Sequence, residues 1–244
     1  MRGCACGDRD GVASGRTGIA HVSCLAEQAK ILVAEAEENN LGGKVLIERW
    51  ERWYKCSLCE QQYHGVVRYA LGWACWKTYV GRPETNVARK NAMTQLGNGL
   101  SAASHHEDAL SVREAELAVK RRIGVSEHSI LVVQSNLANT YTMLGRPEEA
   151  LRMRKDTYSR TSNLMGEEHR ETLHEACNYA LSLLSLKHLE EAKSLFRKVI
   201  PVARRVQGDN DEKTIRMRWY FAVALSQDEG ASLDDLREAI TTLE

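Results

Sequence analysis

The sequence predicts a mainly α-helical chain, in which an α-α superhelical solenoid of helical hairpins follows a small, cysteine-rich N-terminal region. Three observations predict this fold class. Only three prolines occur in 244 residues, and long stretches carry apolar residues at the i, i+3, i+4 spacing of amphipathic helices. Small residues and glycines recur every 41 or 42 residues in the C-terminal two-thirds. Five of the seven cysteines lie before residue 60.

The N-terminal region contains three closely spaced pairs of Cys and His residues. They are Cys4-x-Cys6, His21-x-x-Cys24 and Cys56-x-x-Cys59. Structural zinc is held by four thiolate or imidazole ligands in a tetrahedron, and such pairs are the usual source of these ligands. Because disulfides are rare in reducing compartments, the cysteine cluster predicts a zinc cofactor. Cys75 and Cys177 stand alone, and we expect both to be buried as small hydrophobic residues.

The stretches "RGCACG", "IAHVSCLAEQ" and "CSLCEQQY" within residues 1–64 resemble the RING-CH finger, the C4HC3 RING variant of membrane-associated E3 ubiquitin ligases. That family begins with a Cys-x-x-Cys pair that is absent here, so we interpret the region as an N-terminally truncated finger. The resemblance implies a cross-brace in which the first and third of the present pairs share one zinc ion. The four thiolates would then be those of Cys4, Cys6, Cys56 and Cys59, and His21 and Cys24 would form half of a second site.

Three alternatives to the cross-brace remain open. Cys4, Cys6, His21 and Cys24 can close one zinc site locally, which leaves the third pair unexplained. His64, five residues after Cys59, can complete a damaged site. Without metal, the cysteines are a remnant of a lost finger.

A helix is expected between Cys24 and Cys56. In "LAEQAKILVAEAEENN" the residues Leu25, Ala29, Leu32 and Val33 share one face. RING-type fingers resemble this arrangement, and they recruit a ubiquitin-conjugating enzyme near such a helix, often through a tryptophan. The resemblance therefore makes Trp50 and Trp53 candidate contacts for that enzyme. The alternative is that both tryptophans pack the finger against the first repeat helices.

Residues 65–83 form an aromatic-rich connector between the finger and the repeats. We expect its aromatic side chains, together with one that precedes it, to form an interdomain core. These residues are Tyr63, Tyr69, Trp73, Trp76 and Tyr79.

Residues 84–244 are repetitive. The recurring markers are the glycines Gly124, Gly166 and Gly208, the alanines Ala138, Ala180 and Ala222, and the alanines Ala109, Ala150 and Ala192. The period fits a helical hairpin in which small residues let neighbouring helices approach closely and each glycine ends a helix in a left-handed C-cap. A single hairpin cannot bury its own apolar face, so neighbouring hairpins stack into a solenoid.

The stretches "NLANTYTMLGRPEEAL" and "GEEHRETL" resemble tetratricopeptide repeats, and the 42-residue step resembles the kinesin-light-chain subtype. The resemblance covers residues 84–244, with a weaker first unit in "LGNGLSAASHHEDAL" and an insertion, "SQDEGASLDDL", in the last. It implies a concave groove for a protein or peptide, lined by positions five, nine and twelve of the first helix in each repeat. Aligned in this way, the positions are Ser135, Asn139 and Thr142, then Cys177, Leu181 and Leu184, then Trp219, Val223 and Ser226.

In that groove, asparagine side chains are expected to hold an extended peptide backbone. The alternative is that several of these residues pack between repeats.

Composition excludes several classes of function. Basic and acidic residues are equal in number, 33 each, so no long-range field favours nucleic acid or anionic lipid. No apolar run approaches the roughly 18 residues that a membrane span needs, and no secretory signal is apparent. We therefore expect an intracellular protein, cytoplasmic or nuclear, without nucleic-acid or membrane partners.

Two functional hypotheses follow. No phosphate-binding loop, dinucleotide fingerprint or nucleophile elbow occurs, so no catalytic residue is predicted. The first hypothesis is a zinc-binding, RING-type E3 ubiquitin-ligase-like adaptor, whose repeats choose a protein substrate and which needs no catalytic nucleophile of its own. The second is a non-enzymatic repeat scaffold whose vestigial finger caps the solenoid.

Overall fold

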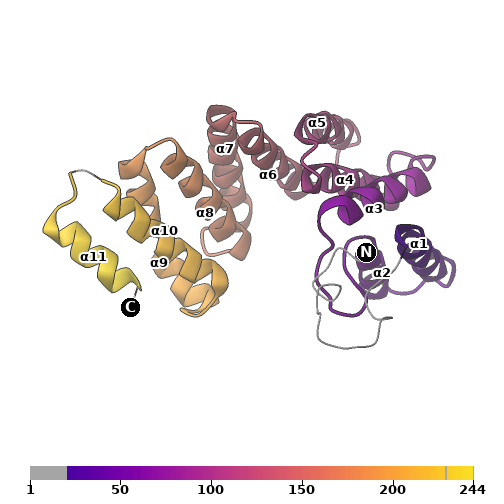
Figure 1. The fold of residues 1–244 in the computed structure, drawn as a ribbon, viewed down its shortest axis with the longest axis horizontal. Helices are drawn as coiled ribbons and strands as arrows, with labels where there is room; N and C mark the ends of the chain where they lie inside the picture. The colour runs from indigo at the N-terminus through magenta and orange to yellow at the C-terminus, as the bar shows by residue number, and fades with distance from the viewer. Residues whose placement is uncertain (1–20, 229, 244) are drawn as a thin grey trace. The chain divides into compact units, whose positions relative to one another are not determined.

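The computed structural model describes residues 21–228 and 230–243, which are mainly α-helical (Figure 1). The described helices are α1 (Val22–Glu38), α2 (Gly43–Trp50), the short 3-10 helix η2 (Glu51–Trp53), α3 (Gly65–Tyr79), α4 (Val87–Ala102), α5 (His106–Arg122), α6 (Glu127–Met143), α7 (Pro147–Met165), α8 (Arg170–Ser185), α9 (Leu189–Gln207), α10 (Glu212–Ser226) and α11 (Leu233–Leu243). A single antiparallel bridge, between Lys55 and Gln62, is the only β-type pairing in the described part of the chain. The predicted fold class, mainly α, is confirmed.

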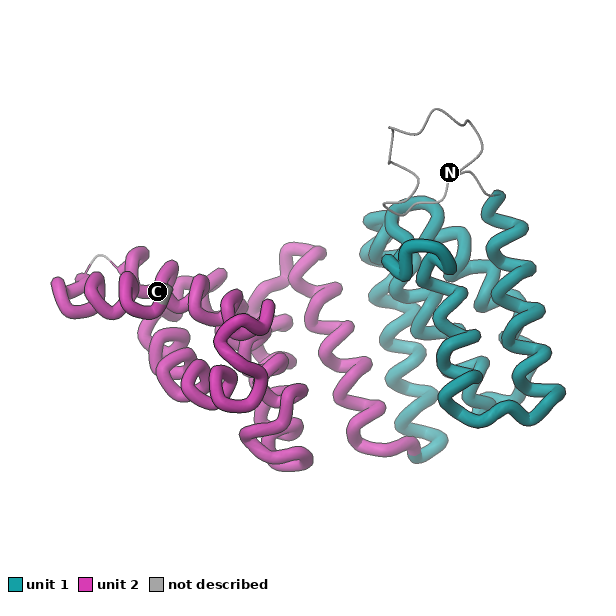
Figure 2. The backbone as a smooth tube through the Cα atoms, turned by 90° about the horizontal axis from the view of Figure 1, so that it is seen from below, with its two compact units in different colours: residues 1–124 teal, residues 125–244 magenta. Residues whose placement is uncertain are grey.

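The chain divides into two compact units, Met1–Gly124 and Val125–Glu244 (Figure 2). Unit 1 contains α1 to α5, and unit 2 contains α6 to α11. The first hairpin of the repeat region, α4 with α5, therefore belongs to the same compact unit as the cysteine-containing region.

In unit 1, the predicted connector contains helix α3, which packs closely against α4. Two glycines allow the close approach. A Cβ atom on Gly72 would lie 2.7 Å from the Gln95 carbonyl oxygen, and one on Gly99 would lie 2.9 Å from the Arg68 carbonyl oxygen. Backbone meets backbone here, so neither position has room for a side chain.

The connector aromatics do not all form a core as expected. Tyr63 and Tyr79 are buried, and Tyr69 and Trp76 are half-buried against apolar clusters of unit 1. Trp73 is exposed, because it lies on the face of α3 that points away from these clusters.

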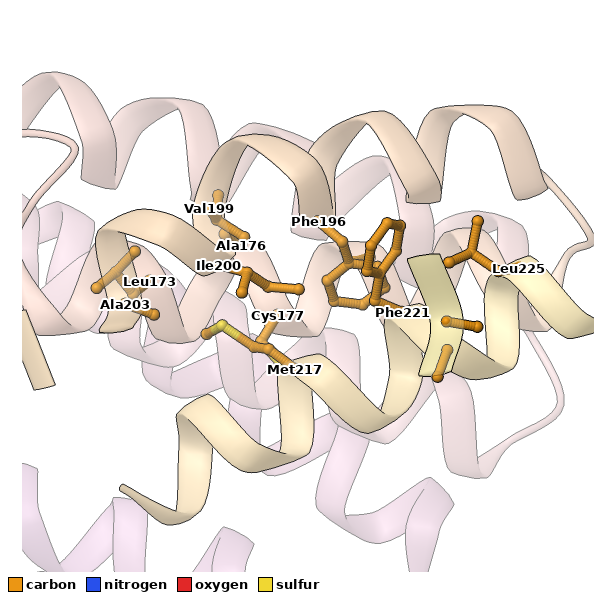
Figure 3. Close-up of a cluster of buried hydrophobic side chains, with 13 residues drawn as sticks. Leu173, Ala176, Cys177, Phe196, Val199, Ile200, Ala203, Met217, Phe221 and Leu225 are labelled. Carbon is orange, nitrogen blue, oxygen red and sulfur yellow. The ribbon is translucent and has the colours of Figure 1, made fainter. Parts of the chain in front are cut away.

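In unit 2 the repeats are the hairpins α6 with α7, α8 with α9, and α10 with α11. The alanines that mark the repeat period are buried throughout, as predicted for close helix contacts. Their exposed fractions are 0% for Ala109, Ala138, Ala180 and Ala192, 1% for Ala150 and 7% for Ala222. The core of the last two hairpins includes Phe196 and Phe221, whose ring centroids are 6.1 Å apart (Figure 3).

The marker glycines end helices with positive φ, as expected, but not all in the predicted conformation. Gly124 has φ +67° and directly follows α5 and its C-cap residue. Gly166 and Gly208 cap α7 and α9 with φ of 89° and 96° and ψ of 159° and 158°. The prediction of a left-handed cap is wrong for these two, because their ψ is extended and places them in a region that only glycine adopts readily.

Candidate functional site

Two of the three α6 residues at the predicted groove positions donate their hydroxyl hydrogens inside unit 2. The Ser135 hydroxyl donates to Glu175 Oε1 at 2.9 Å, and the Thr142 hydroxyl donates to the Ala138 carbonyl at 3.0 Å. Asn139 is exposed, and its Oδ1 accepts a hydrogen bond from Arg154 Nη2 at 2.9 Å. Of the three positions, Asn139 is the one whose hydrogens remain available.

Arg154 and Glu175 are buried charged residues beneath this surface, 8% and 7% exposed. Burial lowers the pKa of the Arg154 guanidinium and raises the pKa of the Glu175 carboxyl. Besides Asn139, Arg154 donates to the Asn178 carbonyl at 3.2 Å, so it connects α7 with both α6 and α8. Sequence reasoning did not identify either of these two buried residues.

An arginine and asparagine pair at the aligned positions of the first hairpin is the sequence signal that could have identified Arg154. In the first hairpin Arg113 Nη2 donates to Asn98 Oδ1 at 3.1 Å, and Arg113 and Asn98 are separated in sequence by 15 residues, as Arg154 and Asn139 are. Arg154 lies 41 residues after Arg113, and Asn139 lies 41 residues after Asn98. In the third hairpin the aligned residues are Leu181 and Phe196, which pack together in an apolar core.

On α8 the predicted groove residues are largely covered. Cys177 is 6% exposed in the core of the last hairpins, and burial raises the pKa of its thiol to about 11. The thiol therefore stays protonated near neutral pH and is a packing residue, as expected for an isolated cysteine. Leu181 and Leu184 are half-buried against the same core.

On α10 the predicted residue Trp219 is 53% exposed. Its ring meets that of Tyr220 edge-on, with centroids 4.8 Å apart. It borders an open hollow of about 650 Å³, lined by Asn210, Glu212, Ile215, Arg216, Arg218, Trp219 and Tyr220. Val223 is half-buried and Ser226 is exposed, with its hydroxyl donating to the Val223 carbonyl at 3.0 Å.

The Cys56–Cys59 pair lies in a tight turn of unit 1. The Cys56 N–H donates to the Gln61 carbonyl at 2.9 Å, and the Glu60 N–H donates to the Cys56 carbonyl at 3.0 Å. The Leu58 N–H donates to Cys56 Sγ at 3.4 Å, and Glu60 has φ +60°. Cys56 and Cys59 therefore lie in one turn of unit 1, with a main-chain N–H directed at the sulfur of the first.

The other predicted metal ligands are only partly described. His21 is the N-cap of α1 and Cys24 lies in its first turn, both exposed. Cys4 and Cys6 lie outside the described residues. Among the residues that the structure describes, no three His, Cys, Asp or Glu side chains gather as a metal site would require, and this holds for His64 with the Cys56 pair.

The two candidate tryptophans have different environments. Trp53 is 1% exposed and packs α1 and η2 against α3 and α4, in agreement with the packing alternative. Trp50 is half-buried and lines a largely apolar cavity of about 310 Å³. The cavity is lined by Val33, Glu37, Leu46, Ile47, Trp50, Asn86, Val87, Ala88 and Asn91.

A comparison with protein families matches residues 129–205 to the tetratricopeptide repeat. The matched residues run from α6 into α9 of unit 2. No curated protein matches the chain significantly. Within the described residues, no helix has the length and apolar character to cross a bilayer.

Solved structures share the fold at low identity. One is a Podosopora anserina protein described as a kinesin light chain with nearly identical TPR-like repeats. It is 17% identical with TM-score 0.60, over 92% of this chain and 95% of that one. BtubC (BKLC) from P. vanneervenii is 14% identical with TM-score 0.51, over 92% and 82%. Bacillus thuringiensis PlcR, in complex with the peptide PapR7 and DNA, is 13% identical with TM-score 0.54, over 91% and 69%.

Proposed function

We propose that this chain is a protein-interaction module whose unit 2 repeats bind a protein or peptide segment. The observation that carries the proposal is Trp219, a large aromatic side chain that is 53% exposed at a predicted groove position and borders an open hollow. An exposed tryptophan beside a second aromatic ring offers apolar contact area at little cost in side-chain entropy, and such residues are enriched at binding sites.

The comparison with PlcR supports the same proposal. That structure holds a peptide, and its fold is shared over 91% of this chain. The exposed residues at predicted groove positions, such as Asn139 on α6 and Trp219 on α10, come from different repeats, which suits an extended ligand.

The test is selection of peptides from a random display library on the full chain, followed by calorimetric titration of the selected peptides. Trp219→Ala should weaken binding by tenfold or more, about 1.4 kcal/mol or above. Trp73→Ala is the matched control, since Trp73 is exposed on α3 of unit 1 and lies outside the predicted groove. Peptides that bind equally well to wild type and Trp219→Ala would contradict the proposal.

A second function, zinc binding by a RING-CH-like finger in unit 1, is favoured by the turn at Cys56 and Cys59. Both thiols lie in this turn, in which the Leu58 N–H donates to Cys56 Sγ and Glu60 has a positive φ. Zinc there would be structural, and the residues proposed to hold it are Cys4, Cys6, Cys56 and Cys59, with His21 and Cys24 as a further pair. On this reading a ubiquitin-conjugating enzyme is the proposed second partner.

Elemental analysis tests the zinc proposal. Wild type should carry about one zinc per chain, as one tetrahedral four-thiolate site requires, and Cys56→Ser/Cys59→Ser should lose it. Cys177→Ala, which removes a buried thiol from unit 2, should retain it. Zinc-loaded chain is then assayed for autoubiquitination with a panel of conjugating enzymes; a zinc-loaded chain that is inactive with all of them favours the scaffold.

A further inference from the structure

Asn139 differs from its groove neighbours in how its hydrogen-bonding groups are used. The hydroxyl hydrogens of Ser135 and Thr142 are donated inside unit 2, to Glu175 and to the Ala138 carbonyl. The Asn139 side chain is exposed, and only its Oδ1 is bonded to another described residue. Its Nδ2 group, with two hydrogens, is left for solvent or a ligand.

The partner of Oδ1 fixes which way this amide points. A guanidinium has only donors, so the amide must turn its oxygen to Arg154 and its nitrogen away. Arg154 is itself held beneath the surface, 8% exposed, by the Asn178 carbonyl at 3.2 Å and by Thr142 Oγ1 at 3.5 Å. Rotation of the amide by 180° would place two donors against each other and lose the 2.9 Å bond.

We propose that Arg154 is a positioning residue, which holds the Asn139 amide with Nδ2 outward so that the groove donates to a main-chain carbonyl of an extended peptide. The inference rests on the proposed peptide-binding function and deepens it. It also changes the expected role of Asn139. A free asparagine can bond both the N–H and the C=O of a peptide unit, whereas this one acts as a donor.

The same pairing recurs in unit 1, where Arg113 Nη2 donates to Asn98 Oδ1 at 3.1 Å. A buried arginine and an asparagine 15 residues before it are thus combined twice, in aligned positions. The third hairpin fills the aligned positions with Leu181 and Phe196, which belong to an apolar core and carry no charge. Packing alone therefore does not require arginine here, and a polar role explains the pair better.

The first experiment needs no ligand. In ¹⁵N-labelled full chain, the Asn139 side-chain amide should have a high order parameter. Arg154→Met should lower it to that of Asn163, an exposed asparagine on α7, and Arg154→Lys should restore most of it, because lysine also only donates. An Asn139 amide as mobile as that of Asn163 in the wild type would overturn the inference.

The second experiment titrates peptides selected on wild type whose binding depends on Trp219. Asn139→Asp, which presents acceptors instead of donors, should weaken binding about threefold to tenfold, the value of one hydrogen bond. Arg154→Met should weaken it about twofold to threefold, since the amide must be reoriented on binding. Asn163→Asp, an exposed change outside the predicted groove, is the control.

A double-mutant cycle distinguishes a role of Arg154 in positioning the Asn139 amide from a general role of Arg154 in the stability of unit 2. In the Asn139→Leu background, Arg154→Met should have no further effect on affinity, because there is no amide left to orient. An equal loss in both backgrounds, or full binding by Asn139→Asp, overturns the role of Arg154 while peptide binding through Trp219 stands. Failure to select any Trp219-dependent peptide overturns the proposed function and this inference with it.

Discussion

At the residue scale, the contact between Gly72 and Gly99 leaves no room for a side chain between α3 and α4. We predict that Gly99→Ala destabilises the chain by about 1–3 kcal/mol, the usual cost of overpacking. The added Cβ would lie 2.9 Å from the Arg68 carbonyl oxygen and 3.2 Å from Tyr69 Cα, and backbone atoms cannot move aside as a flexible side chain can. Differential scanning calorimetry measures the loss.

Gly43→Ala is the matched control for this substitution. Gly43 lies in helix α2 and a Cβ there meets no atom within 4 Å. Alanine should be neutral or slightly stabilising at that position, because it has the higher helix propensity. Equal melting temperatures for the two variants would contradict the close-packing account.

Glu175 gives a prediction about pH. Burial raises the pKa of its carboxyl above the usual 4.5, so the folded state binds this proton more tightly than the unfolded state. The contribution of Glu175 to the free energy of unfolding therefore falls as the pH rises from about 4.5 through the folded-state pKa. Glu175→Gln cannot ionise, and its amide oxygen can still accept from Ser135.

We expect Glu175→Gln to gain stability relative to wild type as the pH is raised from about 4 to about 7. Urea unfolding of both proteins at the two pH values measures the difference. A gain that is the same at both pH values would show that ionisation of Glu175 carries no cost in the fold.

The environments of some of these residues could be predicted from the sequence, and those of others could not. The buried alanines and the positive φ of the marker glycines follow from period and residue type alone. Glu175 was missed because its environment depends on Ser135 and Arg154, which lie on other helices. The exposure of Trp73 was also missed, since an aromatic-rich stretch does not state which face of its helix is covered.

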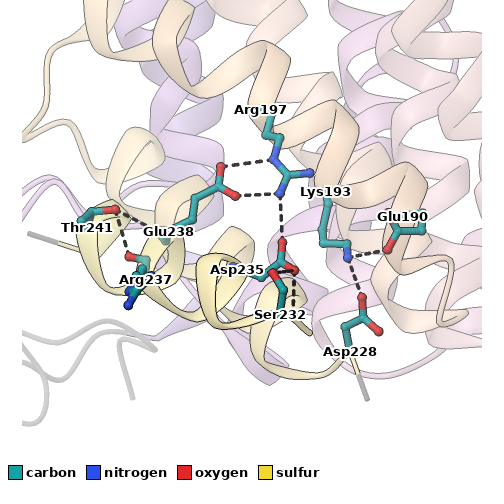
Figure 4. Close-up of polar contacts among 9 residues, drawn as sticks. All are labelled: Glu190, Lys193, Arg197, Asp228, Ser232, Asp235, Arg237, Glu238 and Thr241. Atoms are coloured by element: carbon teal, nitrogen blue, oxygen red, sulfur yellow. Dashed lines mark hydrogen bonds and ion pairs between the residues drawn. The ribbon is translucent and has the colours of Figure 1, made fainter. Parts of the chain in front are cut away.

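At the scale of elements, α11 is attached to α9 by a polar network (Figure 4). Lys193 is 4% exposed and its Nζ is bonded to Glu190 and, at 2.6 Å, to Asp228 Oδ2. Arg197 Nη2 donates to Glu238 Oε2 at 2.6 Å and to Asp235 Oδ1 at 3.3 Å. These contacts connect α9 with α11 and with Asp228, which lies in the segment before α11 where the repeat pattern is interrupted.

We predict that Asp228→Ala loosens α11 from α9, because the buried Lys193 ammonium loses one of its two carboxylate partners. Amide hydrogen exchange in α11 should become faster, while α6 and α7 are unchanged. Asp234→Ala is the control, since Asp234 is exposed and its ion pair is with Arg237 on α11 itself. Unchanged exchange in α11 of Asp228→Ala would contradict the role of this network.

Helix α3 and its contact with α4 mark the limit of what the repeat period predicts about helices. The repeat period predicted the hairpins of unit 2, because each repeats the same small and large positions. Residues 65–83 carry no such repeat, and their aromatics suggested a connector without indicating its secondary structure. The Gly72 and Gly99 contact that joins α3 to α4 involves two residues far apart in sequence, and no local pattern links them.

At the scale of the whole molecule, unit 2 should fold by itself. Unit 2 has apolar clusters of its own, one around Phe196 and one around Leu183, and it has three stacked hairpins, about the number that a repeat array needs for stability. We predict that a fragment of residues 125–244 has a helical circular-dichroism spectrum and a cooperative thermal transition. A fragment without either would show that unit 2 needs unit 1.

A fragment of residues 84–244, which starts at the predicted domain boundary, is the informative comparison. It keeps α4 and α5 but lacks α3, so the glycine face of α4 has no partner. Hydrogen exchange should be fast in α4 and α5 and slow in α6 to α9 of this fragment. Equal protection of all these helices would favour the boundary read from the repeat period.

The position of Trp219 has a practical consequence for such a fragment. The other four tryptophans, at positions 50, 53, 73 and 76, all lie in unit 1. In residues 125–244 the indole emission therefore comes from Trp219 alone, which is half open to water. A ligand that covers this ring removes water from it and should shift its fluorescence to shorter wavelength, so the proposed binding surface carries its own spectroscopic reporter without any label.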